Sequence, residues 1–272
     1  MPLKAIYNSI ASQYDTADCF GSITESHDCA IEQINQANID TASHCNILDM
    51  GVGDGSFLRK IKPYFPAADL TGIDVSDEML KRAGTDLSLN AIEASAAQAT
   101  QYVPANSQDL VLAHFINAYI PIKTLFQQAQ TLTRDQGHFS IITTTYESFP
   151  VAQQHLANFI ARESLLSSIV GHYYKAVVKN TTVAAGEEEL LQAFDDHKFE
   201  VLEHKRLYIP ITLNNIDELA LFGIEGTWFL NTLSIRMLPK KFLLQRIKRL
   251  FHKIFTFPYE DTHVIDVVLA KK

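Results

Sequence analysis

The sequence predicts a doubly wound α/β fold, in which helices cover both faces of a mostly parallel sheet. From residue 46 onward, short apolar runs alternate with helix-like segments of the length that parallel crossovers need. The first run ends in three spaced glycines and is followed directly by a helical pattern, a context typical of ligand-binding βα units. With 272 residues, 47% of them apolar, the chain can bury the core of one large domain.

The N-terminal part is predicted to be helical, because Ile6, Ile10 and Ile34 belong to apolar stripes with helical spacing. We assign residues 1–45 to an N-terminal helical lid and residues 46–272 to the main domain.

Strands and helices then alternate through the first half of the main domain. The predicted strands are 46–50, 69–73, 91–93, 109–115 and 138–143. The predicted helices are 56–64, 77–83 and 122–132, and a turn is expected at 134–137. Ser76 is a candidate N-cap because its hydroxyl can accept a hydrogen bond from the first turn of the following helix, which is acidic.

The second half has longer helical stretches and fewer strands. Residues 151–179 are predicted to be mostly helical, followed by a helix at 187–195 and strands at 200–210 and 263–270. Two insertions, at about 151–180 and 211–262, are predicted to cap the domain.

Composition excludes several classes of protein. The three cysteines have no metal-ligand spacing, which disfavours a zinc site or a disulfide framework and favours a reducing, cytoplasmic location. No apolar run approaches the length of a membrane span. The net charge of -8 disfavours nucleic-acid binding, although residues 239–255 concentrate six Lys or Arg without an acid.

The glycine turn carries the strongest chemical signal. Gly51, Gly53 and Gly55 let the backbone turn sharply and let a ligand approach the main chain. Ser56 stands where a dinucleotide fingerprint needs glycine, which disfavours a nicotinamide oxidoreductase, and Asp49 indicates a cationic, amino-acid-like portion of the ligand. The alternative is a tight turn without a ligand.

Asp74 ends the second predicted strand, 19 residues after Gly55, where a carboxylate can accept both hydroxyls of a ribose. Met79, one turn into the next helix, can lie against an adenine ring. The alternatives are an ordinary acid before a helix and a core methionine.

Four segments together resemble the class I S-adenosylmethionine-dependent methyltransferases of the small-molecule type. They are ILDMGVGDG, LTGIDVSDEMLKRA, SQDLVLAHFINAYI and LTRDQGHFSIITTT, in the family's order over about residues 46–145. The resemblance implies S-adenosylmethionine as cofactor and a seven-stranded sheet with an antiparallel last strand. It implies that the glycine turn holds the methionine moiety, Asp74 the ribose, and Val75 and Met79 the adenine.

The chain departs from the family pattern after the third strand. Ser95 and Ala96 stand where many members have an acid near the adenine, so contacts there are expected from these two residues instead. The N-terminal segment IYNSIASQYD is similar to the entry helix of family members that act on small molecules. Tyr14 would close over the cofactor, supported by Tyr7, since an aromatic face attracts a sulfonium cation. The alternative is that both tyrosines pack the lid.

Methyl transfer depends mainly on positioning, and a base is needed only where the acceptor must lose a proton. His114, at the end of the fourth strand, is the candidate base and is also assigned to the cofactor site. Asn117 and Tyr119, which follow it, are assigned to the acceptor. A structural, hydrogen-bonded histidine is the alternative for His114.

Further acceptor contacts are predicted from the insertions, at His172, Tyr173 and Trp228. If the last two strands are antiparallel, the second insertion roofs the acceptor pocket. Its basic segment, Lys240–Phe255, is either a cap helix or a docking surface for a membrane or an anionic carrier. We therefore expect methylation of a small-molecule, lipid-like or carrier-linked acceptor, the alternative being a catalytically silent cofactor-binding partner protein.

Overall fold

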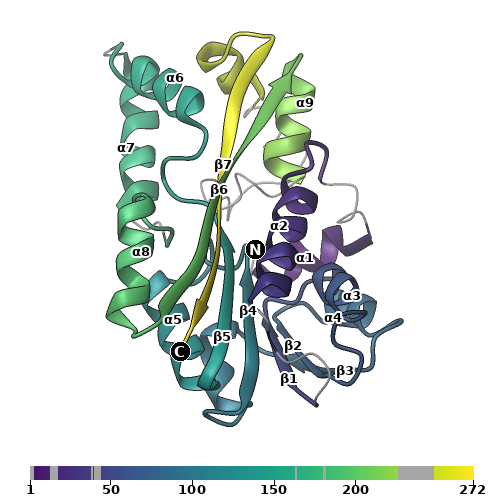
Figure 1. Cartoon of the computed structure of the whole chain (residues 1–272). Coiled ribbons are helices and arrows are strands. Elements are labelled where there is room, and N and C mark those ends of the chain that lie inside the picture. The colour runs from purple at the N-terminus through teal and green to yellow at the C-terminus, as the bar shows by residue number, and fades with distance from the viewer. Residues whose placement is uncertain are drawn as a thin grey trace.

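The computed structural model describes residues 3–12, 18–37, 39, 44–162, 164–179, 182–225 and 248–272. Within these ranges, seven strands form one sheet in the order β3-β2-β1-β4-β5-β7-β6 (Figure 1). They are β1 (Asn46–Met50), β2 (Asp69–Asp74), β3 (Leu89–Glu93), β4 (Gln108–His114), β5 (Thr133–Thr143), β6 (Glu200–Leu213) and β7 (Tyr259–Lys271). The first five pair in parallel, whereas β7 is antiparallel to both β5 and β6. The predicted fold class, with its antiparallel last strand, is confirmed.

Helices cover both faces of the sheet (Figure 1). The described helices are α1 (Leu3–Ile10), α2 (Ser22–Gln36), α3 (Ser56–Ile61), α4 (Asp77–Ala83), α5 (Ile122–Leu132), α6 (Pro150–Ile160), α7 (Leu165–Lys179), α8 (Glu187–Asp196) and α9 (Ile216–Ala220), with a 3-10 turn η2 (Ala96–Gln101) and a π turn η3 (Leu221–Glu225). Ile34 of α2 and Phe57 of α3 pack on one face with Leu112. Phe126 of α5 and Phe194 of α8 pack on the other face. Two apolar cores thus sandwich the sheet.

The predicted elements of the first half are close to the observed ones. β1, α4 and α5 have the predicted bounds, and Ser76 caps α4 by accepting a hydrogen bond from the Met79 N–H at 3.1 Å. The prediction was wrong about helix 56–64, which ends at Ile61: Lys62 still has helical dihedral angles and bonds the Leu58 carbonyl, but Pro63 has no N–H with which to continue the helix. The predicted turn at 134–137 lies inside β5 as a bulge, where the register with β4 shifts.

The last two strands are longer than predicted. β6 continues to Leu213 and β7 begins at Tyr259, so the connection between them spans 214–258. Residues 207–213 and 259–265 pair only with each other, beyond the end of β5, and form a two-stranded ribbon. Pro210 lies within β6, which is an edge strand, where a missing N–H is tolerated.

The two described helices of residues 1–45 pack differently. α2 lies on the sheet, with Ala30 and Ile34 buried in the core beside β7. α1 instead contacts α4 at the carboxyl ends of the parallel strands. Of these two described helices, α1 is therefore the one that lies over the ligand-binding edge of the sheet.

Candidate active site

The strand order reverses between β1 and β4, and the glycine loop, residues 49–55, lies at the carboxyl end of β1 beside this reversal. Gly51 and Gly55 have φ of 92° and 85°, and a Cβ on Gly55 would come within 3.0 Å of Ala83. Gly53, with φ of 54°, has no atom within 4 Å of the position that a Cβ would take. Packing thus requires glycine at Gly55, whereas Gly53 faces open space that a ligand can enter.

Asp49 provides a buried acidic group at the start of this loop. Its carboxyl is 2% exposed, and among the described residues nothing donates a hydrogen bond to its Oδ1. Burial, and secondarily the charge of Asp74, raise the pKa of Asp49 to about 8. A buried acceptor without a donor is costly. An ammonium group in the open space would supply that donor, so the residues fit the amino-acid end of S-adenosylmethionine.

Asp74 lies at the end of β2 and links the glycine loop to α4. Its Oδ2 accepts the Gly53 N–H at 3.0 Å, and its Oδ1 accepts the Ser76 N–H at 2.8 Å. Burial raises the pKa of Asp74, although these backbone bonds act to lower it. A carboxylate has about four acceptor positions, so Asp74 retains capacity for ribose hydroxyls.

The residues predicted to contact adenine surround the same edge but differ in exposure. Val75 is half-buried, whereas Met79 is fully buried in the core. Ser95 caps η2 by accepting the Ala97 N–H at 3.3 Å, and Ala96 is 4% exposed. Of these, Val75 and Ser95 retain exposed surface toward a ligand.

Helix α1 is held over this edge by polar contacts. Tyr7 donates a hydrogen bond to the Tyr119 hydroxyl at 2.6 Å, which ties α1 to the loop after β4. Asn8 accepts from the Ser76 hydroxyl at 2.6 Å and donates to Asp77 at 3.0 Å. Tyr14, the predicted aromatic gate, lies outside the described residues.

His114 is enclosed in the core beneath the glycine loop. Its ring lies 4.3 Å from that of Phe57, its Nε2 is 3.1 Å from the Ser140 hydroxyl, and the side chain is 8% exposed. Burial, and secondarily the neighbouring His27, hold the pKa of His114 well below the ordinary value. The Nδ1 atom is buried without a hydrogen-bond partner among the described residues, so the role of His114 as a base stays a prediction.

The predicted acceptor residues are not gathered at one place. Asn117 is fully buried and its amide bonds the Thr143 hydroxyl at 3.3 Å, while Tyr119 contacts α1. His172 is exposed on α7. The structure does not describe the side chain of Tyr173. Outside the described residues also lie Trp228 and residues 240–247 of the basic segment.

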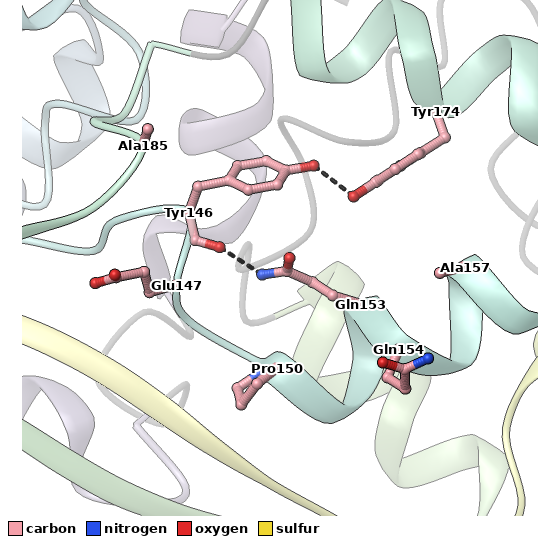
Figure 2. Close-up of a pocket in the computed structure, with 8 residues that line it drawn as sticks. All are labelled: Tyr146, Glu147, Pro150, Gln153, Gln154, Ala157, Tyr174 and Ala185. Atoms are coloured by element: carbon pink, nitrogen blue, oxygen red, sulfur yellow. Dashed lines mark hydrogen bonds between the residues drawn. The ribbon is translucent and has the colours of Figure 1, made fainter.

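A cavity that the sequence did not predict opens at the end of β5 (Figure 2). This cap cavity has a volume of about 620 Å³ and lies between the segment after β5, helices α6 and α7, and the approach to α8. It is lined by Tyr146, Glu147, Pro150, Gln153, Gln154, Ala157, Tyr174 and Ala185. The sequence did contain a signal for this cavity, because Tyr146 and Glu147 closely follow a strand end at the ligand-binding edge.

The fold and the glycine loop together define a Rossmann-like methyltransferase domain. A family model described as a methyltransferase domain matches residues 47–137. The trans-aconitate 2-methyltransferase of Streptomyces avermitilis is 33% identical over 79 residues, 28% of this chain and 29% of that enzyme. The chain therefore aligns with less than a third of this relative.

Two solved structures share the fold. The YcgJ protein of Bacillus subtilis has a TM-score of 0.59 at 12% identity, covering 92% of this chain and 98% of that one. The geranyl diphosphate C-methyltransferase of Streptomyces coelicolor, solved with S-adenosyl-L-homocysteine, has a TM-score of 0.50 at 12% identity, covering 91% and 78%. Residues 47–137 thus match a methyltransferase-domain family, in line with the resemblance that the sequence predicted, and the solved structures show that the chain shares the fold of such proteins.

Proposed function

We propose that this protein transfers a methyl group from S-adenosylmethionine to a small-molecule acceptor. The observation that carries the proposal is the buried Asp49 carboxyl, whose Oδ1 lacks a donor, beside the open space at Gly53. Asp49 would bind the ammonium of the cofactor, the glycine loop its methionine backbone, and Asp74 its ribose. When bound, the cofactor supplies a methyl group on a sulfonium, which leaves as a neutral thioether.

The chain's own residues position the reactants and exclude water. Tyr7 and Asn8 hold α1 across the edge, so that the cofactor is covered on the side away from the sheet. The acceptor would approach from the end of β5, where the cap cavity opens. Positioning and exclusion of water are sufficient for much of the rate enhancement of methyl transfer, which needs no acid.

We also expect a cytoplasmic location. We further expect that Lys240–Phe255 docks to a membrane or an anionic carrier. Among the described residues, no helix is both long and apolar enough to cross a bilayer. Of the basic segment, residues 248–254 are described as helical, and Phe251 packs against the core.

Replacing Asp74 with Ala tests the cofactor site. We expect the affinity for S-adenosylhomocysteine, measured by isothermal titration calorimetry, to fall at least about 100-fold, because the ribose and the Gly53 N–H both lose a charged acceptor. Asp69→Ala is the matched control, because Asp69 is exposed at the other end of the same strand. Full affinity in Asp74→Ala would contradict the placement of the cofactor.

Turnover with a broad acceptor panel, followed by release of S-adenosylhomocysteine, tests the reaction itself. Cofactor binding without turnover of any acceptor would favour the silent partner protein instead.

A further inference from the structure

The cap cavity has the size and location of a small-molecule site. Pockets for such ligands usually have volumes of about 300 to 1,000 Å³, and this one has about 620 Å³. Tyr146 follows the end of β5 by three residues, at the edge where parallel strands place ligands. β5 is the second strand from β1 in the sheet, so the cavity lies beside the cofactor edge.

Two tyrosines form one wall of the cavity. Tyr146 donates a hydrogen bond to the Tyr174 hydroxyl at 2.6 Å, which joins the segment after β5 to α7 (Figure 2). Gln153 donates to the Tyr146 carbonyl at 2.5 Å and to the Ser148 carbonyl at 2.8 Å, which fixes this segment on α6. The wall is therefore preorganised, and tyrosine faces attract organic cations.

Among the described residues that line the cavity, the charge has one sign. Glu147 is the charged one, and none of the eight described lining residues is Lys, Arg or His. Behind Glu147, the Arg206 guanidinium lies 2.6 Å from Glu147, 3.2 Å from Glu187 and 2.8 Å from Asp266. Three carboxylates around one guanidinium leave a formal charge of -2.

This arrangement opposes anions. An anionic ligand would lose hydration in the cavity without gaining a cationic partner from the described lining, whereas an ammonium group would be attracted by the net negative charge around Glu147 and by the tyrosine rings. Arg206 also holds Glu147 in position, since it remains bound to the fully buried Asp266 through two further nitrogens.

We infer that the cap cavity binds an organic cation of the amine class, and that such an amine is the methyl acceptor. The second part rests on the proposed function. An ammonium ion must first release one proton to water; its nitrogen lone pair then bonds the methyl carbon while the carbon–sulfur bond breaks toward sulfur.

Paired probes of similar shape and opposite charge test the inference. Binding of phenethylamine, 3-phenylpropionate and trans-aconitate to the full chain is measured by ligand-observed NMR at pH 7.5, with and without S-adenosylhomocysteine. We expect phenethylamine to bind at least tenfold more tightly than either anion. Glu147→Gln should weaken phenethylamine about tenfold, whereas Glu188→Gln, the same charge change at an exposed position of α8, should leave binding unchanged.

A second variant keeps the test decisive if Glu147→Gln is unstable. Tyr174→Leu removes an aromatic wall and should weaken phenethylamine several-fold, whereas Tyr174→Phe should retain binding within about twofold. Tighter binding of 3-phenylpropionate or trans-aconitate, or no binding of phenethylamine, would overturn the inference. If S-adenosylhomocysteine still binds, only the inference fails; if it does not, the proposed function fails as well.

Discussion

The glycine loop and the cap cavity lie at the same edge of the sheet, but the chain builds them in different ways. Residues 46–79 alone supply the strand, turn, acids and helix start of the glycine loop. The cap cavity takes its walls from the segment after β5, from two helices and from Ala185. Local sequence therefore determines the loop, whereas the cavity exists only after distant segments pack together.

Their electrostatics differ as well. In the glycine loop, the Asp49 carboxyl is buried without a compensating cation, so its charge depends on a ligand. At the cap cavity, Asp266 is fully buried but is bonded by both His204 and Arg206. The first region lacks a partner that a ligand would supply, whereas the buried carboxylate of the second is paired within the protein itself.

The largest expected effect that separates the two regions is a pH dependence of cofactor binding. The pKa of Asp49, raised to about 8, keeps this carboxyl mostly protonated at pH 6 in the free protein. An ammonium ligand needs the ionised form, so the affinity for S-adenosylhomocysteine should rise about 50-fold between pH 6 and pH 8.

Calorimetry across this range, in buffers of different ionisation enthalpy, measures both the rise and the proton released on binding. Asp49→Asn should bind weakly at every pH and should abolish the proton release. Because this variant removes a buried ionisable group, its melting temperature should not fall. An affinity independent of pH in the wild-type protein would show that Asp49 does not meet the ligand ammonium.

Lowering the pH should destabilise the contacts of α2 beneath the glycine loop before it destabilises the contacts of Asp266 beside the cap cavity. Burial lowers the pKa of His27 to about 4 and that of His263 to about 3, and it holds that of His114 well below the ordinary value. His27 is part of α2 and His114 packs near His27, whereas His263 lies on β7 opposite Ile209 of β6 and bonds Ser22 of α2. In the unfolded chain each gains a proton below about pH 6.5, so stability falls as the pH falls from about 7 toward 4.

Each of these histidines should cost about 1.4 kcal/mol of unfolding free energy at pH 5.5. In contrast, burial acts to raise the pKa of Asp266, but the hydrogen bonds and charges of His204 and Arg206 together lower it. The contribution of Asp266 to the free energy of unfolding therefore persists until below about pH 4. Amide exchange at pH 7 and 5.5 should therefore show faster opening of α2 than of residues 200–206 of β6, which pair with the Asp266 end of β7 and not with His263.

His27→Leu should reduce the pH dependence of stability, whereas His172→Asn, on an exposed position of α7, should not change it. Equal acceleration of exchange in α2 and β6 would contradict the contrast.

The sequence predicted the region around the glycine loop almost completely, because its signals are local. The bounds of β1 and α4, the Ser76 cap and the positions of Asp49 and Asp74 all follow from patterns within 40 residues. The cap cavity could not be predicted in the same way, because neither Tyr146 nor Tyr174 has a motif of its own. Their pairing depends on how α7 packs, and side-chain packing over 28 residues leaves no periodic signal.

His114 illustrates the limit of assigning a role from position along a strand. Its location at the end of β4 was correctly predicted, but the face of the sheet on which its ring lies decides its environment. Residues on β4 alternate between the two cores, and His114 belongs to the face covered by α2 and α3. A one-residue difference in register separates a core histidine from one on the opposite face.

The smallest expected effect concerns the described end of the basic segment, residues 248–254. Lys248 forms an ion pair with Asp217 of α9, whereas Arg249 is exposed. Because such surface pairs contribute about 1 kcal/mol or less, Lys248→Glu should lower stability only slightly, and Arg249→Glu should leave it unchanged.

If the segment docks on an anionic membrane, each reversal should weaken binding to vesicles containing phosphatidylserine several-fold, since each basic residue near such a surface contributes about 1 kcal/mol. Unchanged vesicle binding and unchanged binding to an acyl carrier protein in the double variant would leave this segment as a cap helix, and the acceptor would then enter through the cap cavity alone.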